Sequence, residues 1–214
     1  MVTFFGFLVF LALILLGCFY LFVKSHLNAI PAKGGIKPNK KFDVVTFHSY
    51  KPPKGTIPER GKRVATAAVD WALHYDCPIL LNVGHTVPGD PRMESEIYAQ
   101  YIRVKINAQV KIITGRDSDV RDTDREVKSC FGFCIGQGYK SLCVVAAYPH
   151  LGSRILEYWY RVNKGRQIDI TFVGVHVQPR IYLWELAMML VDKVFLPAGS
   201  KRRELVLNFM GRKG

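Results

Sequence analysis

Residues 141–150 read SLCVVAAYPH, and this stretch decides the fold of the chain. Its first seven residues are small or apolar at almost every position, which suits a strand that is buried on both faces. Tyr148, Pro149 and His150 follow at once, and a helical pattern begins at Ser153. A buried strand that leads directly into a helix is typical of a parallel sheet with helices on both sides.

The same strand-then-helix pattern recurs from residue 42 to residue 200. Apolar, β-branched runs predict strands over 43–48, 78–83, 109–114, 141–147 and 168–175. Helical patterns lie between and after them, over 59–75, 94–106, 123–135, 153–162 and 179–195. We therefore expect one α/β domain over 42–200, a Rossmann-like three-layer sandwich with a mainly parallel five-stranded sheet.

The segment before this domain has the pattern of a membrane helix. Val2 to Val23 is a run of 22 residues without a charged side chain. At about 1.5 Å per residue this run is long enough to cross the roughly 30 Å hydrocarbon layer of a bilayer. A cleaved signal peptide is the competing interpretation, but it requires a basic start, and no Lys or Arg precedes the run. We expect a transmembrane helix over 1–23.

Most of the positive charge lies next to this helix and at the end of the chain. Of the 30 Lys and Arg residues, ten lie in 24–63 and five in 201–214, so residues 64–200 hold fifteen basic and fourteen acidic side chains. The central domain is nearly neutral, and specific nucleic-acid binding is not expected. Residues 24–41 predict a basic juxtamembrane linker near anionic lipid. Residues 201–214 predict a basic amphipathic tail that packs on the domain or binds lipid.

The lysines after the apolar run predict the orientation of the chain. No acidic residue lies among the first five of them, which are Lys24, Lys33, Lys37, Lys40 and Lys41. The positive-inside rule then predicts that the N-terminus lies outside and the domain in the cytoplasm. The five cysteines are odd in number and scattered, which fits a reducing compartment better than a disulfide framework.

Four of the six histidines follow the ends of predicted strands. His48 follows the first strand, Gly84 and His85 the second, His150 the fourth and His176 the fifth. Ligands of parallel sheets bind at the edge formed by the carboxyl ends of the strands, so a cleft is expected there. The competing interpretation is that these are ordinary polar loops. No metal-ligand spacing or nucleotide motif accompanies the histidines, so no metal is assigned.

Charged residues near this edge leave further alternatives open. Glu94 and Glu96 end a long Gly- and Pro-containing loop, and they either cap a helix or act as functional carboxylates. Residues 115–124 mix Arg with Asp and form either a solvated ion-pair loop or a polar site. His150 and Arg154 lie four residues apart across a helix start, which suits an anion or an ordinary helix with a surface arginine.

An ordered set of segments over roughly 42–190 suggests a family. The set is DVVTFHS, PERGKRVATAA with Arg60 and Arg63, PILLNVG before ESEIYAQYI, the Asp122-Thr123 step, VVAAYPH before Arg154, and IYLWELA with Glu185 and Ala187. It resembles the YdcF-like superfamily, which includes the envelope proteins SanA and ElyC. This chain has His48 and Ser49 where the family usually has glycines, and Glu126 where it has an asparagine.

The resemblance implies a role in cell-envelope biogenesis or barrier function. It also implies a polar cluster of Arg63, Glu96, Thr123, His150 and Arg154, which His48 and Gly84 join as residues of the same edge. Arg63 and Arg154 would hold an anion, His150 would act as general acid or base, and Glu96 would orient it or position water. We expect Arg154→Ala to abolish binding while changing stability by no more than ~1 kcal/mol, as for an exposed residue.

Two classes of function follow from these patterns. In the first, the domain acts on an anionic or phosphorylated, lipid-linked envelope precursor at the membrane. In the second, it is a non-catalytic, membrane-tethered binding or regulatory module, for which the resemblance suggests a nucleotide-like ligand such as S-adenosylmethionine. The resemblance also implies a domain outside the cytoplasm, which is the alternative to the orientation that the lysines predict.

Overall fold

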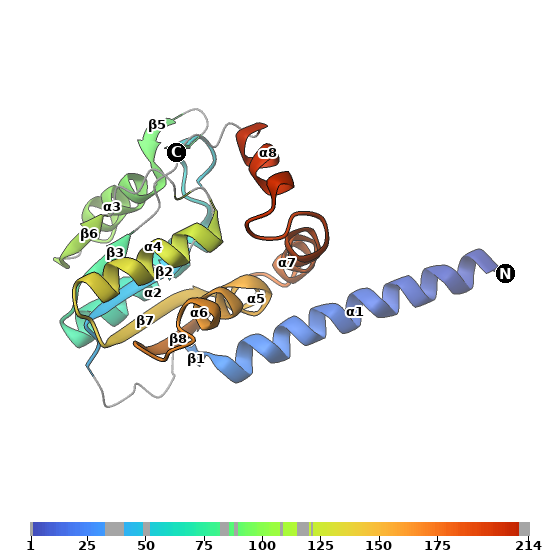
Figure 1. Ribbon diagram of the computed structural model, residues 1–214, viewed down its shortest axis with the longest axis horizontal. Helices are drawn as coiled ribbons and strands as arrows, with labels where there is room; N and C mark the ends of the chain where they lie inside the picture. The colour runs from blue at the N-terminus through green and yellow to red at the C-terminus, as the bar shows by residue number, and fades with distance from the viewer. Residues whose placement is uncertain are drawn as a thin grey trace.

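A computed structural model describes residues 2–32, 41–48, 52–81, 86–87, 90–107, 109–114, 120 and 122–209 of the chain. Its centre is a six-stranded sheet with the strand order β1-β8-β7-β2-β3-β6 (Figure 1). Every neighbouring pair in it is parallel. The strands are β1 (Ile30–Pro31), β2 (Val44–His48), β3 (Ile79–Leu81), β6 (Ile112–Thr114), β7 (Ser141–Ala147) and β8 (Asp169–Val175).

The five predicted strands are all present, and they correspond to β2, β3, β6, β7 and β8. Taken in chain order as strands 1 to 5, they lie in the order 3-2-1-4-5. This is the order of a doubly wound, Rossmann-like sheet. The predicted number of five strands was wrong by one, because Ile30 and Pro31 pair with Val173 and Gly174 of β8. A two-residue edge strand leaves no sequence pattern, and an edge tolerates the missing N–H of proline.

Helices cover both faces of this sheet. On one face α2 (Glu59–Tyr75) and α3 (Glu94–Lys105) pack on the strands, and on the other α4 (Thr123–Gly136) and α6 (Leu156–Val162) do so (Figure 1). Neighbouring residues of β2 enter different cores, Val45 the first and Val44 the second. The residues of β2 and β3, and all of β7 after Ser141, are therefore buried on one face or the other, which explains their unbroken apolar runs in the sequence.

Two connections at the carboxyl edge have structure of their own. The long loop after β3 contains a small antiparallel hairpin of β4 (Thr86–Val87) and β5 (Asp90–Met93). A short turn of helix, η1 (Pro53–Gly55), precedes α2.

After β7 the chain runs as one helical path through α5 (Tyr148–His150), the π-helical turn η2 (Leu151–Ile155) and α6. The extra residue per π turn shifts the side chains that follow His150 relative to a regular helix.

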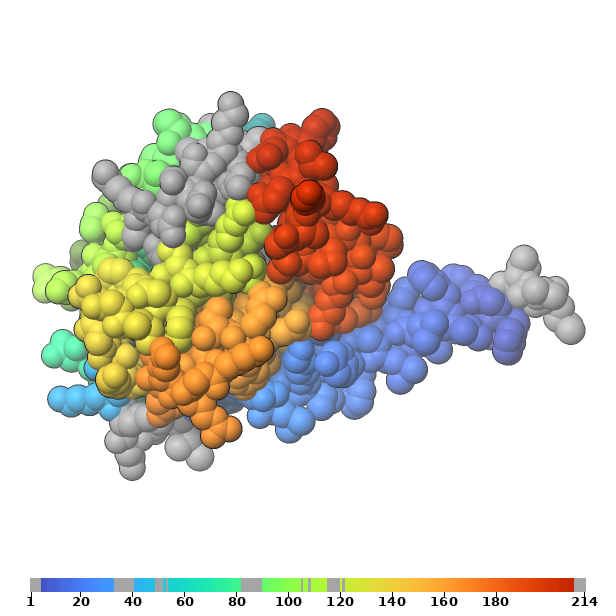
Figure 2. Space-filling model, in the orientation of Figure 1, coloured from blue at the N-terminus to red at the C-terminus, as the bar shows by residue number. Residues whose placement is uncertain are grey.

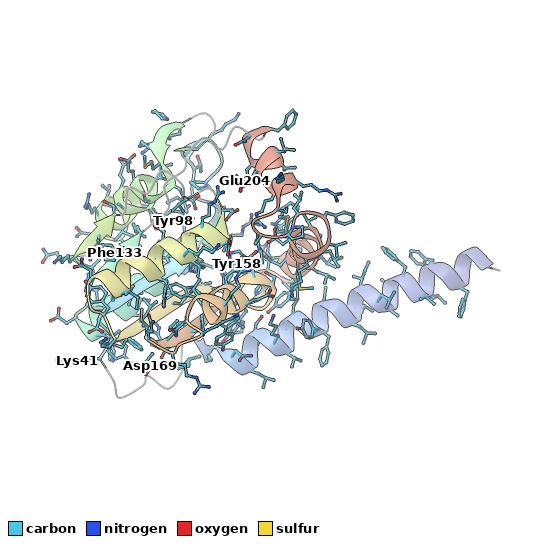
Figure 3. The ribbon with its side chains drawn as sticks, in the orientation of Figure 1. Lys41, Tyr98, Phe133, Tyr158, Asp169 and Glu204 are labelled. Carbon is cyan, nitrogen blue, oxygen red and sulfur yellow. The ribbon has the colours of Figure 1, made fainter. Side chains whose placement is uncertain are left out.

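The N-terminal helix α1 (Val2–Asn28) is one helix that is long and apolar enough to cross a membrane. It continues five residues beyond the predicted end at Val23 and leads through Ala29 directly into β1. The first part of the predicted linker is thus helix and strand, while residues 33–40 lie outside the described residues. Leu21 and Ser25 are fully buried against the domain. The last turns of α1 therefore belong to the folded body, whereas its first turns extend away from it (Figures 1 and 3).

Three helical segments complete the chain at the carboxyl edge. They are α7 (Arg180–Leu190), the π-helical η3 (Val191–Phe195) that continues it, and α8 (Lys201–Phe209). Arg203 and Leu207 are buried, so the described part of the predicted tail packs on the domain. Leu205 and Phe209 of the same helix point outward with 70% and 93% exposure.

Candidate functional site

The doubly wound order places a topological switch point between β2 and β7, where a ligand crevice is expected. The two strands end at His48 and Ala147, and His150 follows in the first turn after β7. Both predicted histidines therefore stand at the switch point, and both are buried, with 0% and 3% exposure. The sequence placed them correctly at this edge, but they lie inside the protein and not on an open cleft wall.

The imidazole of His48 is held between a tryptophan and a carboxylate. Trp159 Nε1 donates a hydrogen bond of 2.9 Å to His48 Nε2. Because an indole N–H can only donate, Nε2 is the acceptor and the ring proton sits on Nδ1. This Nδ1 lies 3.1 Å from Glu126 Oε1. With both nitrogens facing protein groups, His48 positions neighbouring side chains and is poorly placed to bind a ligand.

His150 is bound to a buried carboxylate on α7. Its Nδ1 lies 3.2 Å from Glu185 Oε2, and Ser153 Oγ donates to the same oxygen at 2.7 Å. Burial lowers the pKa of His150 and outweighs the effect of Glu185, so the ring is neutral near pH 7. Burial alone would raise the pKa of Glu185, but the hydrogen bond from the His150 ring and the charge of Arg154 hold this pKa well below its usual range. Glu185 is therefore a buried carboxylate anion, and its Oε1 has no hydrogen-bond partner among the described residues.

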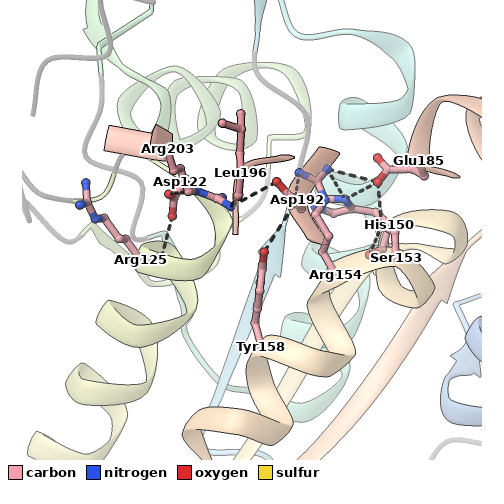
Figure 4. A network of polar contacts seen from close by, with 10 residues as sticks. All are labelled: Asp122, Arg125, His150, Ser153, Arg154, Tyr158, Glu185, Asp192, Leu196 and Arg203. Atoms are coloured by element: carbon pink, nitrogen blue, oxygen red, sulfur yellow. Dashed lines mark hydrogen bonds and ion pairs between the residues drawn. The ribbon is translucent and has the colours of Figure 1, made fainter. Parts of the chain in front are cut away.

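Arg154 joins this carboxylate to a second one. Its guanidinium lies 3.2 Å from Glu185 and 3.4 Å from Asp192, and the side chain is 14% exposed. Asp192 in turn pairs with Arg203 at 3.2 Å, and Arg203 pairs with Asp122 at 2.8 Å. Figure 4 shows this chain of contacts, which joins η2, α7, η3, α8 and the start of α4. We call it the switch-point network: Asp122, His150, Ser153, Arg154, Glu185, Asp192 and Arg203.

The positive and negative charges of the switch-point network nearly balance one another. Two guanidiniums, Arg154 and Arg203, face three carboxylates, and His150 is neutral. Such a set has no positive charge to spare for an anion. Ser153 Oγ donates to Glu185, with the backbone oxygen of His150 as a longer alternative at 3.2 Å, and not to the His150 ring, so this histidine does not activate it as a nucleophile. The arrangement therefore favours a structural role, which the sequence prediction of an exposed Arg154 had missed.

The pocket nearest to the network is lined by mixed charges. Its volume is about 240 Å³, and Arg154, Tyr158 and Asp192 are among the residues that line it. Lys193 and Glu157 line it as well, and they pair at 2.9 Å. Burial raises the pKa of Tyr158 to about 12, so its phenol stays protonated. Among the described residues no group of three or more His, Cys, Asp or Glu side chains is placed to hold a metal ion.

Arg63 lies in a different part of the same edge. With Arg60 and Arg180 it lines a pocket of about 130 Å³ between the start of α2 and the loop from β8 to α7. Three arginines there face a single acidic side chain, Glu59, whose distance to Arg63 is 3.6 Å. The side chain of Arg63 is 55% exposed. We call this the arginine pocket, because three arginines and one carboxylate stand among the described residues that line it.

The remaining predicted residues do not join either cluster. Met93 N–H donates to Glu96 Oε2 at 2.9 Å, so Glu96 caps α3 and the capping alternative is the one observed. Thr123 is the first residue of α4, after the N-cap Asp122, which accepts from the N–H of Arg125 at 3.0 Å. Gly84 lies outside the described residues. The five-residue cluster expected from the family resemblance is thus divided between separate places.

Several residues that build the site had not been predicted as site residues. They are Trp159, Asp192, Arg203 and Arg180, together with Glu185 and Glu126, which were noted without a role. One signal was available for Glu185, which interrupts the apolar run 181–190. A carboxylate inside an apolar helix needs a buried partner. In the structure His150 and Arg154 are the partners of Glu185.

Comparison with known proteins does not add to this description. No family model matches the chain, and no curated protein matches it. The resemblance to the YdcF-like superfamily rests on the ordered residues of the sequence alone.

Proposed function

We propose that this chain is a membrane-anchored α/β domain that binds an anionic, phosphate-bearing ligand in the arginine pocket. The single observation that carries the proposal is the convergence of Arg60, Arg63 and Arg180 on one pocket at the carboxyl edge of the sheet. A guanidinium group can bind phosphate through two parallel N–H bonds. The N-terminal end of α2 adds backbone N–H donors, which also carry partial positive charge. The pair of Arg63 with Glu59 is exposed and weak, so an incoming anion can replace it.

Binding without chemistry fits the described residues better than catalysis. The predicted general base His150 and its expected partner Glu96 lie in different places, one buried in the switch-point network and the other at the cap of α3. Arg154 is engaged by two carboxylates. This supports the non-catalytic class of function, with Arg63 as the residue of the predicted set that keeps a binding role.

The position of the pocket supports a ligand at the membrane surface. Arg180 begins the helix α7, and α7 packs on α1, the helix that would cross the bilayer. A lipid-linked phosphate and a soluble phosphate compound share the chemistry that this pocket recognises. The family resemblance favours the lipid-linked form, an envelope precursor that meets the protein at the membrane. The lysines near α1 favour a cytoplasmic pocket, and the resemblance favours one outside the cytoplasm.

The test uses the full chain in lipid nanodiscs. Inorganic pyrophosphate is titrated by calorimetry in one arm, and a polyprenyl phosphate is incorporated in the nanodisc and followed by ³¹P NMR in the other. Arg63→Ala removes a charged hydrogen-bond donor and is expected to weaken binding about tenfold to hundredfold. Arg103→Ala, an exposed arginine on α3, is the matched control and is expected to bind as the parent does.

The two arms separate the sources of the phosphate. Binding of pyrophosphate alone identifies a soluble ligand, and binding of the polyprenyl phosphate alone identifies a lipid-linked one. Equal effects of Arg63→Ala and Arg103→Ala, or no binding in either arm, would contradict the proposal.

A further inference from the structure

Helix α7 and its continuation η3 carry an exposed apolar stripe. Leu183, Trp184, Leu190, Val194 and Phe195 are 52%, 55%, 50%, 63% and 63% exposed. Leu183, Leu190 and Val194 are spaced by seven and four residues, and Trp184 and Phe195 by eleven, so they lie on one side of the helix over about four turns. We call these five residues the apolar stripe. Apolar side chains gathered in this way mark a contact surface and not ordinary scattered exposure.

The acidic residues of the same helical segment point the opposite way. Glu185 is fully buried, and Asp192 has a side chain that is 9% exposed. Both belong to the switch-point network and hold α7 and η3 to the domain (Figure 4). A helix at a water-facing surface buries its apolar side and exposes its charges. This segment instead buries its acids and exposes the apolar stripe, and its exposed cations are Arg180 at its start and Lys193, which pairs with Glu157. The stripe itself is therefore suited to an apolar medium.

The contact with α1 fixes the depth of this surface. A methyl group added to Gly17 of α1 would lie 2.9 Å from Leu186, and the rings of Phe22 and Tyr182 lie 6.1 Å apart. The part of α1 before this contact, residues 2–16, spans only about 22 Å at 1.5 Å per residue. The hydrocarbon layer is roughly 30 Å thick, so a spanning α1 needs residues 17–22 within it as well. The helix α7 then meets the bilayer where it touches α1.

The direction of α7 completes the argument. In Figure 1 the helix α1 lies in the plane of the view and α7 is seen close to end-on, so the two helices cross steeply. Figure 2 shows α7, η3 and α8 as one surface beside the emerging α1. When α1 crosses a bilayer, α7 lies along the bilayer surface. This is the geometry of an interfacial amphipathic helix.

We propose that α7 and η3 form an in-plane membrane helix whose apolar stripe enters the acyl-chain region of the leaflet that adjoins the domain. This inference rests on the part of the proposed function in which α1 spans the membrane. The domain is then held at two places, by α1 and by the stripe, and it cannot rotate freely about α1. The arginine pocket, which Arg180 lines one turn before Trp184, is thereby kept at the level of the lipid headgroups.

The test uses Trp184 as a reporter. The chain has three tryptophans, and Trp71 and Trp159 are only 2% and 0% exposed. In nanodiscs of lipids brominated on the acyl chains, Trp184 is expected to lose most of its emission, while aqueous iodide is expected to have little effect on it. The variant Trp184→Phe should lack the component that brominated lipid quenches. Strong iodide quenching with no bromine quenching would place the stripe in water and overturn the inference.

A second variant separates this inference from the insertion of α1. Phe10→Trp, made together with Trp184→Phe, places the reporter on an exposed position of α1. Bromine quenching of this variant without quenching of Trp184 would show that α1 inserts and that the stripe does not, which overturns the inference and leaves the anchor. Quenching of neither would overturn both. Protection of Trp184 from both quenchers would indicate a second copy of the chain on the stripe and would also overturn the inference.

Discussion

The indole nitrogen of Trp159 and Nε2 of His48 lie 2.9 Å apart at the end of β2. The contact ties α6 to the carboxyl end of β2, beside the switch point of the sheet, and it sets the tautomer of a fully buried histidine. Because Nε2 accepts from the indole, and Nδ1 lies 3.1 Å from Glu126 Oε1, both ring nitrogens face protein groups. His48 is therefore a positioning residue for the edge of the sheet.

Trp159→Phe is expected to destabilise the domain by about 1–3 kcal/mol, since it leaves the buried acceptor of His48 unsatisfied and removes part of a buried ring. Urea unfolding of the full chain in detergent micelles measures the change. The matched control is Trp184→Phe, which alters a tryptophan that is 55% exposed and makes no such bond. Equal stability of the two variants would argue against a structural role for the pair His48–Trp159.

Arg154→Ala is expected to cost about 3–5 kcal/mol of unfolding free energy, because the carboxylates of Glu185 and Asp192 would lose their shared cation inside the protein. This replaces the expectation of a change within ~1 kcal/mol, which applied to an exposed arginine. The exposed Arg103→Ala, measured in the same denaturant series, should stay within about 0.5 kcal/mol of the parent. A small effect of Arg154→Ala would restore the interpretation of Arg154 as a ligand-binding residue.

The depressed pKa of Glu185 predicts acid sensitivity. The folded chain keeps this carboxylate ionised, because the hydrogen bond from His150 and the charge of Arg154 outweigh the effect of burial. The unfolded chain takes up a proton near pH 4.3, so acid favours unfolding from about pH 5 downward. The contribution of ionised Glu185 to the stability of the folded chain is complete above about pH 5, and it is lost as the pH falls toward the pKa of Glu185 in the folded state. Buried His150 adds a second loss of stability at higher pH. Its pKa is lowered in the folded chain, whereas the unfolded chain takes up a proton on this residue near pH 6.5, so acid favours unfolding below that pH.

Glu185→Gln should therefore be less stable than the parent at pH 7 and should lose less stability between about pH 5 and pH 3. Unfolding free energies at a series of pH values measure this slope. The control Asp70→Asn changes an exposed acid on α2 and should leave the slope unchanged. Some slope will remain in Glu185→Gln, because Asp122 also has a lowered pKa, through its bond to the N–H of Arg125 and its pair with Arg203, against the effect of burial. Identical slopes for parent and Glu185→Gln would contradict the prediction.

The fold was largely predictable because its signals are local. Strands buried on both faces appear as continuous apolar runs, and all five runs became strands of the sheet. The capping of α3 by Glu96 was one of the two alternatives that the sequence left open. The strand β1 was missed, because two residues that pair with β8 carry no pattern of their own.

The site was less predictable because its contacts are distant in sequence. The sequence indicated that His48, His150 and Arg154 stand at one edge, which the doubly wound order makes geometrically necessary. It did not indicate that Glu185 and Asp192, 31 and 38 residues beyond Arg154, would neutralise that arginine. Whether a cation is a ligand site or a structural partner depends on such long-range pairs, and residue types along one segment do not determine them.

Gly152→Ala tests the docking of α1 on the domain. A methyl group at this position would meet Ser25 Oγ and would lie 2.7 Å from the backbone oxygen of Leu21. The backbone of α1 cannot yield as a flexible side chain can, so we expect a loss of about 1–3 kcal/mol in micelle unfolding experiments. Gly132→Ala is the matched control, because nothing lies within 4 Å of its added methyl group in the described structure. This control should gain up to about 1 kcal/mol from higher helix propensity. A gain in both variants would show that α1 is not packed on η2.

The orientation of the domain can be tested with one engineered thiol. Four of the five native cysteines are buried in the domain, and the fifth, Cys18, lies in α1. Val104→Cys adds a thiol at a position of α3 that is 66% exposed and far along the chain from α1. The lysines after the apolar run predict that this position lies in the cytoplasm, and on that prediction a membrane-impermeant maleimide should label it only after the cells are permeabilised. The parent chain, treated in the same way, gives the background from Cys18. Labelling of Val104→Cys in intact cells would put the domain on the outer side, which is the orientation implied by the family resemblance, and the arginine pocket would then meet an extracytoplasmic ligand.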